Sequence, residues 1–511
     1  MDSVKALFVR ETERAVASPR LSKSRFVSGL QCLKRLWWEV HERDAVEFEP
    51  DPATQARMTT GIHVGAVARD YVPGGLLIDE AHNQYGRRIA ATHRALDRGA
   101  RVVYEAAFSR GNVFVAVDIL ERIRQGFVLT EVKSTTSVKD EHVPDVAVQA
   151  HVLRKAGLPV VRMEVMHLNR ECRHPDLSNL FVREDVTDQV EERLRTVPRQ
   201  VAAQLAALRG PLPDVEPGDH CRVPYECPFM MRCWEPVPPH HVSTLYRIGR
   251  RAAELIEQGY ETIDELPDEL RLNAVAARQA RAVKTGVPVV EPGLAEVLSS
   301  LESPIAFLDF ETVQPAIPVW PGCRPYDQVS AQLSCHVLGR RSGLAHHEWL
   351  ADGPGDPRPE IAERLLDACR SAGTVLAWSS FEKQRIAELA EAVPHRAAEL
   401  RELAARITDF LALVRTHFYH PDFCGSFSMK SVLPVLVPEL SYKGMEVADG
   451  ALATVELERL LLSDPPLDRA ERIRLRAALL AYCHQDTLGM VRVLERLKAL
   501  AGSDGSRRRG R

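Results

Sequence analysis

The sequence predicts a soluble α/β protein with two α/β domains joined by a helical linker. Hydrophobic residues make up 45% of the chain and charged residues 27%, as is typical of a soluble globular protein. At 511 residues the chain is too long for one ordinary hydrophobic core. Short β-rich runs alternate with helical patterns in two regions, residues 21–236 and 301–500. Groups of prolines on either side of residues 221–234 mark the end of the first region.

The first domain is expected to follow a loosely attached leader, residues 1–20. Residues 24–40 and 61–71 carry helical patterns, in which apolar side chains recur on one face. Strands are expected where β-rich runs are bounded by polar turns, near residues 101–108, 113–120 and 126–132. The first domain is therefore expected to place its strands between helices.

Residues 237–300 are expected to form the helical linker. Within it, residues 247–267 have a helix–glycine–turn–helix pattern, which fits either a small hairpin that binds the DNA backbone or a plain helical spacer. The second domain opens with an apolar strand, PIAFLDFETV, and continues through a second strand, GTVLAWSS. It closes with a long helix over residues 474–500, and the basic tail, residues 501–511, is expected to be disordered.

The sequence predicts a cytoplasmic protein without a membrane partner. No stretch approaches the roughly 20 apolar residues needed to cross a bilayer, and the N-terminus lacks the apolar core of a signal peptide. The formal net charge of −4 neither indicates nor excludes nucleic acid, because a polyanion requires a local basic surface. Basic clusters occur at residues 247–251, 278–284 and 507–511, although solvated helix faces or a terminus explain them as well.

A predicted β-hairpin carries the first candidate site. Glu131 and Lys133 are two residues apart, so on a strand they project from the same face, and Asp118 on the partner strand can approach them. Phosphodiester hydrolysis needs a divalent cation to polarise the phosphate, and Mg²⁺ or Mn²⁺ would bind the carboxylates of Asp118 and Glu131. A lysine beside them would orient water or neutralise charge on the phosphate. The spacing alone also fits an exposed cross-strand salt bridge.

Two flanking segments extend this pattern. MTTGIHVGAVARDY places His63 on an amphipathic helix, and DVAVQAHVLRKAG places Gln149 on a helix after the hairpin. Together the three segments resemble the RecB-type nucleases of PD-(D/E)xK fold, which occur in recombination helicase–nucleases and CRISPR-associated nucleases. The resemblance implies His63 as a helix-borne metal ligand, Asp118 and Glu131 as metal carboxylates, Lys133 as the catalytic lysine and Gln149 as the polar residue of the following helix. Many relatives carry tyrosine where this chain has Leu153.

Four of the ten cysteines are set apart by position: Cys32, Cys221, Cys227 and Cys233. Three thiolates in one loop and a distant fourth can hold a cubane iron–sulfur cluster, whereas zinc usually takes CxxC pairs, which are absent here. The order resembles cluster-bearing RecB-type nucleases, although the first gap is five residues where these relatives have two. The resemblance implies a structural cluster of the 4Fe-4S type that couples metal binding to folding. Zinc and unliganded core thiols are the alternatives.

A third group of acidic residues lies in the second domain. AFLDFET places Asp309 and Glu311 on one face of a strand end, and YCHQD places Tyr482 and Asp486 one helical turn apart. With Glu382 after a further strand, the pattern resembles DEDD 3′–5′ exonucleases of RNase H-like fold. The resemblance implies that the four acids bind two metal ions and that Tyr482 orients the water. Relatives usually have aspartate at the position of Glu382, and a degenerate domain that binds without cutting is the alternative.

The patterns together predict a divalent-metal-dependent nuclease that hydrolyses DNA, with single-stranded ends or flaps as substrates and a second, exonuclease-like domain. The order of the domains resembles a family of bacterial proteins whose second domain has no assigned function. DNA is favoured over RNA, and a helicase or repair protein would be a compatible partner. The alternatives are a nucleic-acid-binding scaffold with partly decayed sites, whose binding would weaken steeply with salt, and an RNA exonuclease that depends on Asp309 and not on Lys133.

Overall fold

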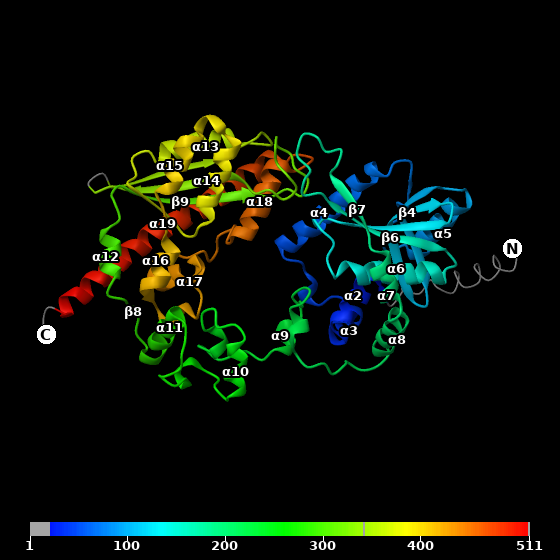
Figure 1. Cartoon of the computed structure of the whole chain (residues 1–511), viewed down its shortest axis with the longest axis horizontal. Coiled ribbons are helices and arrows are strands. Elements are labelled where there is room, and N and C mark those ends of the chain that lie inside the picture. The colour runs from blue at the N-terminus through cyan, green and yellow to red at the C-terminus, as the bar shows by residue number, and fades with distance from the viewer. Residues whose placement is uncertain (1–20, 341–342, 509–511) are drawn as a thin grey trace. The chain divides into compact units, whose positions relative to one another are not determined.

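The computed structural model describes residues 21–340 and 343–508, which form two compact units (Figure 1). Unit 1 contains residues up to 235 together with 316–319 and 323–326, and unit 2 contains the remainder. Both units combine helices with a mixed sheet, so the expected α/β class is confirmed. The helical region expected as a linker lies in unit 2, and the expected leader, residues 1–20, lies outside the described residues.

Unit 1 is built on a seven-stranded mixed sheet. Strands β3 (Val102–Arg110), β4 (Val113–Ile123) and β5 (Gly126–Lys133) form an antiparallel meander that includes the expected hairpin. Helix α6 (His142–Lys155) then returns the chain to β6 (Val160–Leu168), which pairs parallel to β5. The two edge strands are β2 (Leu76–Leu77), on β3, and β7 (Phe181–Asp185), on β6; the short β1 (Leu21–Ser22) pairs parallel with the start of β4.

Helices cover both faces of this sheet. Val103 and Leu129 belong to the core that includes α6, whereas Tyr104 and Met166 pack with the end of α4 (Pro52–Ala68). This helix begins earlier than the expected helix at 61–71, because Asp51 caps it and Pro52 occupies its first turn. The other helices of the unit are α2 (Lys23–Gln31), α3 (Leu33–His41), α5 (Tyr85–Asp97), α7 (Thr187–Leu194), α8 (Val197–Ala207) and α9 (Met230–Cys233).

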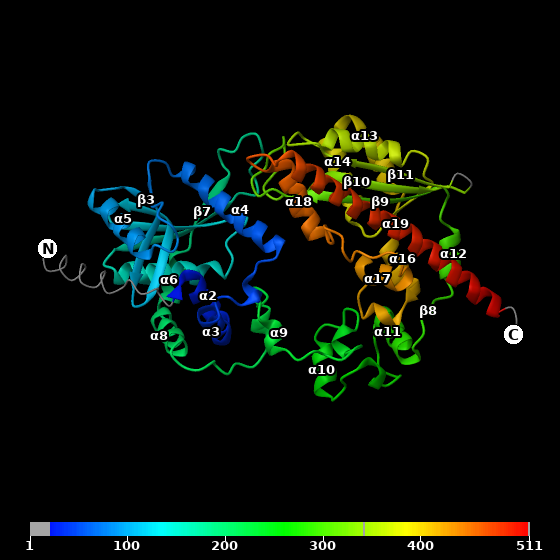
Figure 2. The same cartoon turned by 180° about the vertical axis from the view of Figure 1, so that it is seen from behind.

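Unit 2 contains a five-stranded sheet in the order β11-β10-β9-β12-β13. Strands β9 (Ile305–Val313), β10 (Val329–Leu338) and β11 (Leu344–Leu350) are antiparallel, and β12 (Thr374–Ala377) and β13 (Ile407–Asp409) run parallel to β9. Figures 1 and 2 show one face covered by α13 (Arg358–Ala368), α14 (Phe381–Ala392) and α15 (Ala397–Ala405), and the other by α18 (Gly450–Leu462) and α19 (Arg469–Arg508).

The alternation of side chains on β9 decides where its acids point. Ala306, Leu308 and Phe310 lie in the core beneath α13–α15. Successive residues of a strand face opposite sides of the sheet. Asp309 and Glu311 therefore face α18 and α19, and α19 is the helix that carries Tyr482 and Asp486.

The remainder of unit 2 surrounds a small core of its own, which includes Val242, Leu255 and Ile263. The expected hairpin at 247–267 consists of α10 (Arg251–Glu257), a turn and only a short 3₁₀ segment. The further elements are α11 (Ala274–Thr285), β8 (Val289–Val290), α12 (Leu294–Ser299), α16 (Phe410–His417), β14 (Phe418–Tyr419) and α17 (Met429–Leu436). Helix α19 continues through Arg508 into the segment expected to be disordered, since extending a formed helix costs less than nucleating one; residues 509–511 lie outside the described part.

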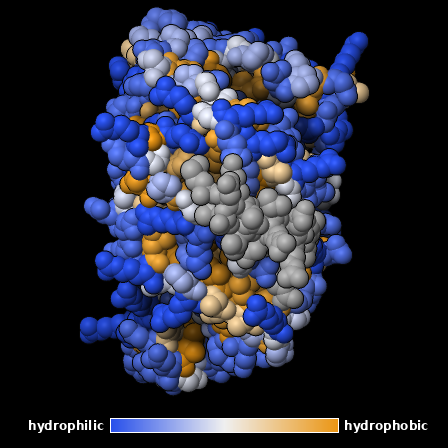
Figure 3. Space-filling model, turned by 90° about the vertical axis from the view of Figure 1, so that its right-hand side faces the viewer, coloured by the Kyte–Doolittle hydropathy of each residue, from blue (hydrophilic) through white to orange (hydrophobic). Residues whose placement is uncertain are grey.

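The surface is mostly polar on the face shown in Figure 3, where hydrophilic side chains surround separate, small apolar patches. Among the described residues, no helix has both the length and the apolar character required to cross a membrane.

Candidate active sites and a cysteine cluster

The hairpin of unit 1 and helix α6 bring four of the expected residues together. Gln149 on α6 donates to the buried Glu131 Oε2 at 2.7 Å, and Lys133 Nζ lies 2.8 Å from Glu131 Oε1. Asp118 on β4 accepts a hydrogen bond of 2.7 Å from the backbone N–H of Val132, which holds it beside β5. One site therefore contains Asp118, Glu131, Lys133 and Gln149.

Two further charged residues complete this site. Lys23, at the start of α2, places its Nζ 2.8 and 3.0 Å from the two oxygens of Glu131 and 3.6 Å from Asp118 Oδ1. Asp145 on α6 accepts a 2.6 Å hydrogen bond from Lys133 Nζ. Asp145 could have been predicted as a site residue, because it lies four residues before Gln149 and residues with this spacing share a helix face. Lys23 carried no such signal, since 108 residues separate it from Glu131.

Glu105 is a third residue that the sequence patterns did not reveal. It lies on β3 between residues that pair with Val117 and Ile119, and so faces the position of Asp118. Its φ of 57° is in the left-handed region, which a non-glycine residue rarely adopts within a strand. Arg88 binds its carboxylate at 3.1 Å. The negative charge of Glu105 adds to the field that acts on Asp118.

The charges of this site compensate one another. Burial raises the pKa of Asp118 to about 7, and the charge of Glu131 adds to the rise. Burial alone would also raise the pKa of Glu131, but Lys133 and Lys23 hold it well below its usual range. The carboxylates of Glu131 and Asp145 outweigh burial in turn and raise the pKa of Lys133. Glu131 is thus an ionised carboxylate between two charged ammonium groups.

His63, the expected helix-borne ligand, lies on α4 with an exposed side chain. In the part of the chain that the structure describes, no hydrogen bond or ion pair joins it to Asp118 or Glu131. The structure therefore does not bring His63 into contact with the other four expected residues.

Strand β9 and helix α19 form a second acidic site in unit 2. Ligand atoms of Asp309, Glu311 and Cys483 lie within 4.8 Å of one another. The thiol of Cys483 donates to Asp309 Oδ2 at 3.2 Å. Cys483 was not among the expected site residues, although it directly follows Tyr482.

Asp486 lies one turn further along α19 and is held by two tyrosines. The hydroxyl of Tyr442 donates to Asp486 Oδ1, and Tyr482 also forms a hydrogen bond with this carboxylate. Burial nevertheless raises the pKa of Asp486 to about 6. The expected pairing of Tyr482 with Asp486 is present, whereas Tyr442 lies outside the motif and gave no local signal.

Glu382, in the first turn of α14, contributes the fourth carboxylate. Burial raises its pKa to about 7, although backbone N–H groups of Glu382 and Ser379 act in the opposite direction. Among the described residues no hydrogen-bond partner reaches its buried Oε2 atom. Asp409 has a different, structural role. Its side chain caps α16 by accepting a hydrogen bond from the backbone N–H of Ala412 at 2.7 Å.

In unit 2, little positive charge offsets the negative charges of the acidic side chains. Burial and the neighbouring carboxylates raise the pKa of Asp309 and of Glu311 well above the usual range. Lys430 is a cationic group that acts in the opposite direction on Glu311 and Asp486. A set of oxygen donors with an unpartnered buried oxygen fits hard divalent cations such as Mg²⁺ or Mn²⁺.

The four expected cysteines all lie in unit 1 and carry free thiols. Cys32 caps α3, Cys221 and Cys227 are buried in the loop after α8, and Cys233 ends α9. Cys221, Cys227 and Cys233 pack in one cluster with Trp38 and Phe229. Burial raises the pKa of Cys227 and of Cys233, and the charges of Cys32 and Cys221 add to both shifts.

Aromatic and charged residues support this cysteine cluster. Phe229 packs against Trp38 with ring centroids 4.9 Å apart, and Arg232 lies over both rings while pairing with Glu47 at 2.6 Å. The side chain of Gln31 donates to the backbone oxygens of residues 220 and 225 at 2.7 Å. These contacts join the start of the unit to its end, 189 residues later.

The comparison with curated proteins found no match. A family model described as a domain of unknown function (DUF2779) matches residues 306–428, a segment that lies mostly in unit 2 and contains Asp309, Glu311 and Glu382.

Proposed function

We propose that this chain is a divalent-metal-dependent nuclease that hydrolyses phosphodiester bonds of DNA, with its principal active site at Asp118, Glu131 and Lys133. The observation that carries the proposal is the convergence of these residues with Gln149 from β4, β5 and α6. The hairpin and the helix that carry the resemblance to RecB-type nucleases share one site, which supports a PD-(D/E)xK fold for unit 1.

Each residue of this site would have a separate role in catalysis. Mg²⁺ or Mn²⁺ held by Asp118 and Glu131 would polarise the phosphate and activate water. Lys133 is fixed between Glu131 and Asp145 and stays charged at neutral pH, so its ammonium would stabilise negative charge that develops on the phosphate. Gln149 orients Glu131, and Lys23 supplies positive charge at both Glu131 oxygens.

The four cysteines of unit 1 are proposed to hold an iron–sulfur cluster of the 4Fe-4S type. Cys221, Cys227 and Cys233 pack together with aromatic side chains, and Cys32 begins the helix that carries Trp38 of the same cluster, so the four residues are a suitable donor set once their thiols are deprotonated. The cluster would be structural, because its ligands come from both ends of unit 1. A reducing, cytoplasmic location suits cysteines retained as ligands.

A specific observation favours a second active site in unit 2. Four carboxylates and Tyr482 meet between β9, α14 and α19, and one buried oxygen of Glu382 has no hydrogen-bond partner among the described residues. This arrangement supports an RNase H-like domain with 3′–5′ exonuclease activity on DNA or RNA. Tyr482, beside Asp486, would position the attacking water.

The test uses anaerobically purified full-length protein, labelled single-stranded DNA or RNA, and Mg²⁺ or Mn²⁺. We expect Lys133→Ala to reduce DNA cleavage by about two to three orders of magnitude. The matched control is Lys139→Ala, because Lys139 follows the same strand and, among the described residues, forms an ion pair with Glu141 alone, at 3.9 Å. Asp309→Asn is compared with Asp367→Asn, an acid exposed on α13.

The outcomes separate the competing functions. Loss of DNA cleavage in Lys133→Ala alone assigns the chemistry to unit 1. Loss in Asp309→Asn alone, on DNA or RNA, assigns it to unit 2. If the wild-type protein cleaves neither nucleic acid yet binds both with a steep salt dependence, the chain is a binding scaffold and the nuclease proposal is wrong.

A further inference from the structure

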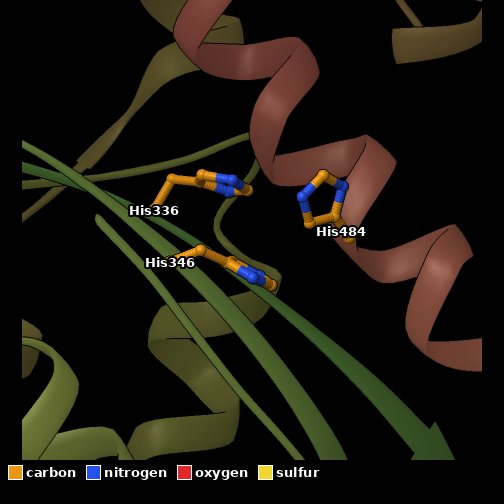
Figure 4. Close-up of side chains that lie close together, drawn as sticks. All are labelled: His336, His346 and His484. Carbon is orange, nitrogen blue, oxygen red and sulfur yellow. The ribbon is translucent and has the colours of Figure 1, made fainter. Parts of the chain in front are cut away.

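Three histidines of unit 2 converge at a place that neither proposed nuclease site uses. His336 on β10 and His346 on β11 are paired across the two strands, and His484 comes from α19 (Figure 4). Their ring centroids are 4.3 Å apart for His336 and His346, 4.9 Å for His336 and His484, and 4.6 Å for His346 and His484. One ligand nitrogen of each ring lies within 4.8 Å of the other two.

Hydrogen bonds to two hydroxyl groups allow one consistent assignment of protons to the ring nitrogens. Thr487 is buried, and its Oγ1 lies 3.2 Å from the backbone oxygen of Cys483, which can only accept, so the hydroxyl proton points there. With the proton in that position, Thr487 Oγ1 accepts from His336 Nδ1, at 2.8 Å, and from Ser334 Oγ, at 2.7 Å. Ser334 Oγ in turn accepts from His346 Nε2 at 2.9 Å.

This proton arrangement leaves His336 Nε2 and His346 Nδ1 as unprotonated lone pairs. A metal-binding histidine usually donates its other ring N–H to a polar partner, which fixes both the tautomer and the ring orientation. His336 and His346 already have such partners. Burial also lowers the pKa of His336 to about 3 and that of His346 to about 4, with the neighbouring imidazoles contributing, so both rings are neutral and able to ligate at neutral pH.

We propose that His336, His346 and His484 bind a first-row transition-metal ion, with Zn²⁺ as the expected occupant. Imidazole nitrogens suit Zn²⁺, Cu²⁺ or Ni²⁺, whereas Mg²⁺ prefers the oxygens of the acidic sites. Three histidines leave a fourth tetrahedral position for water or an exchangeable ligand. His336 is buried while His346 and His484 are partly exposed, which gives an ion access from solvent.

An ion at this site would fasten α19 to the sheet. Ser334 pairs with Asp309 in the register of β10 and β9, and His484 lies next to Cys483, which binds Asp309. The three-histidine site therefore joins α19, which presents Asp486, to β10, the strand that pairs with the one presenting Asp309. Its expected role is to stabilise the arrangement of the acidic site, and it does not depend on whether that site cleaves nucleic acid.

The test measures Zn²⁺ bound per chain, after chelator treatment and readdition of Zn²⁺ to the full-length protein, together with the thermal unfolding midpoint. The variants are His346→Asn and His484→Asn, and the control is His347→Asn. His347 is exposed and pairs with Cys335, whose side chain lies in the core beneath α13–α15, so it projects from the opposite face of the sheet. Wild type and control are expected to bind one Zn²⁺ more per chain than either variant, and to gain thermal stability that the variants do not gain.

Two further measurements keep the result interpretable. Circular dichroism of the metal-free proteins checks that the variants are folded, and Co²⁺ added in place of Zn²⁺ reports nitrogen ligation through its visible absorption. Thr487→Val removes only the hydroxyl that orients His336 and is expected to weaken Zn²⁺ affinity by about tenfold to a hundredfold. Equal Zn²⁺ content in the wild type, His346→Asn and His484→Asn would show that the three histidines are not a metal site.

Discussion

The acidic sites of the two units share their construction and differ in their charge balance. Each places carboxylates on a central strand beside a helix that adds another acid: Asp145 of α6 in unit 1 and Asp486 of α19 in unit 2. In unit 1, two ammonium groups lie within 3.0 Å of Glu131. In unit 2, the carboxylates raise one another's pKa values. Unit 1 can therefore fold with its charges compensated, whereas unit 2 gains more from a bound cation.

The same chemical change should have opposite effects at the two sites. Glu131→Gln leaves Lys23 and Lys133 without their shared partner, and breaking a largely buried ion pair costs about 3–5 kcal/mol. Glu311→Gln instead removes one of several repelling carboxylates, so it should leave the metal-free protein equally stable or more stable. Calorimetric unfolding in chelator at pH 8 measures both. Destabilisation by Glu311→Gln as large as that by Glu131→Gln would contradict the difference in charge balance.

The pH dependence of stability should reveal the uncompensated acids of unit 2. Folding raises the pKa of Glu382 to about 7 and that of Asp486 to about 6, so the folded state binds more protons than the unfolded state. Stability from these groups is present below the ordinary carboxyl pKa of about 4 and is lost as pH rises toward 7. The metal-free unfolding midpoint of unit 2 should fall by several degrees between pH 5 and pH 8. An unfolding midpoint that rises between pH 5 and pH 8 would contradict the raised pKa values of Glu382 and Asp486.

Saturating Mn²⁺ should restore the stability that unit 2 loses as the pH rises. A cation that binds only the folded state contributes about 2.7 kcal/mol when its concentration is 100 times Kd. Asp309→Asn should abolish this gain at pH 8, whereas Asp367→Asn, on the exposed side of α13, should retain it. The His346→Asn background, which lacks a ligand of the proposed Zn²⁺ site, should retain it as well. A gain that survives in Asp309→Asn would place the stabilising cation elsewhere.

How much of these sites could be predicted depends on the distance along the chain between partners. Glu131 with Lys133, and Tyr482 with Asp486, lie within one repeat of a strand or helix, so local periodicity identified them. Lys23 reaches Glu131 across 108 residues, and such a contact is set by tertiary packing alone. The three-histidine cluster shows the same limit, because it combines two strands and a distant helix.

The predicted helices and strands also differ in accuracy, depending on whether a local pattern determines where they begin and end. The strands of the hairpin were predicted nearly to their ends because their apolar patterns are local. The helix expected at 61–71 begins at Pro52, because its start is determined by the cap at Asp51 more than by its apolar face. His63 was correctly placed on a helix, but the sequence did not predict whether its side of that helix faces the other site residues.

The smallest expected effect concerns the two tyrosines that bind Asp486. Tyr442→Phe removes one of two hydroxyl donors, and because Tyr482 remains, the cost should be about 1.5 kcal/mol, at the lower end for a hydrogen bond to a charged group. The loss should be larger at pH 8 than at pH 5, since the lost donor favours the ionised carboxylate. Calorimetry at both pH values measures it.

Tyr482→Phe provides the matched comparison, because it removes the other donor to the same carboxylate. If Tyr482 positions the attacking water in unit 2, this variant should lose exonuclease activity out of proportion to its stability, whereas Tyr442→Phe should lose the two in proportion. Equal losses of activity in the two variants would reduce Tyr482 to a structural partner of Asp486. Unit 2 would then resemble unit 1 in having acids held by neighbouring donors, while the repulsion among its carboxylates and the unpartnered oxygen of Glu382 would still distinguish the two sites.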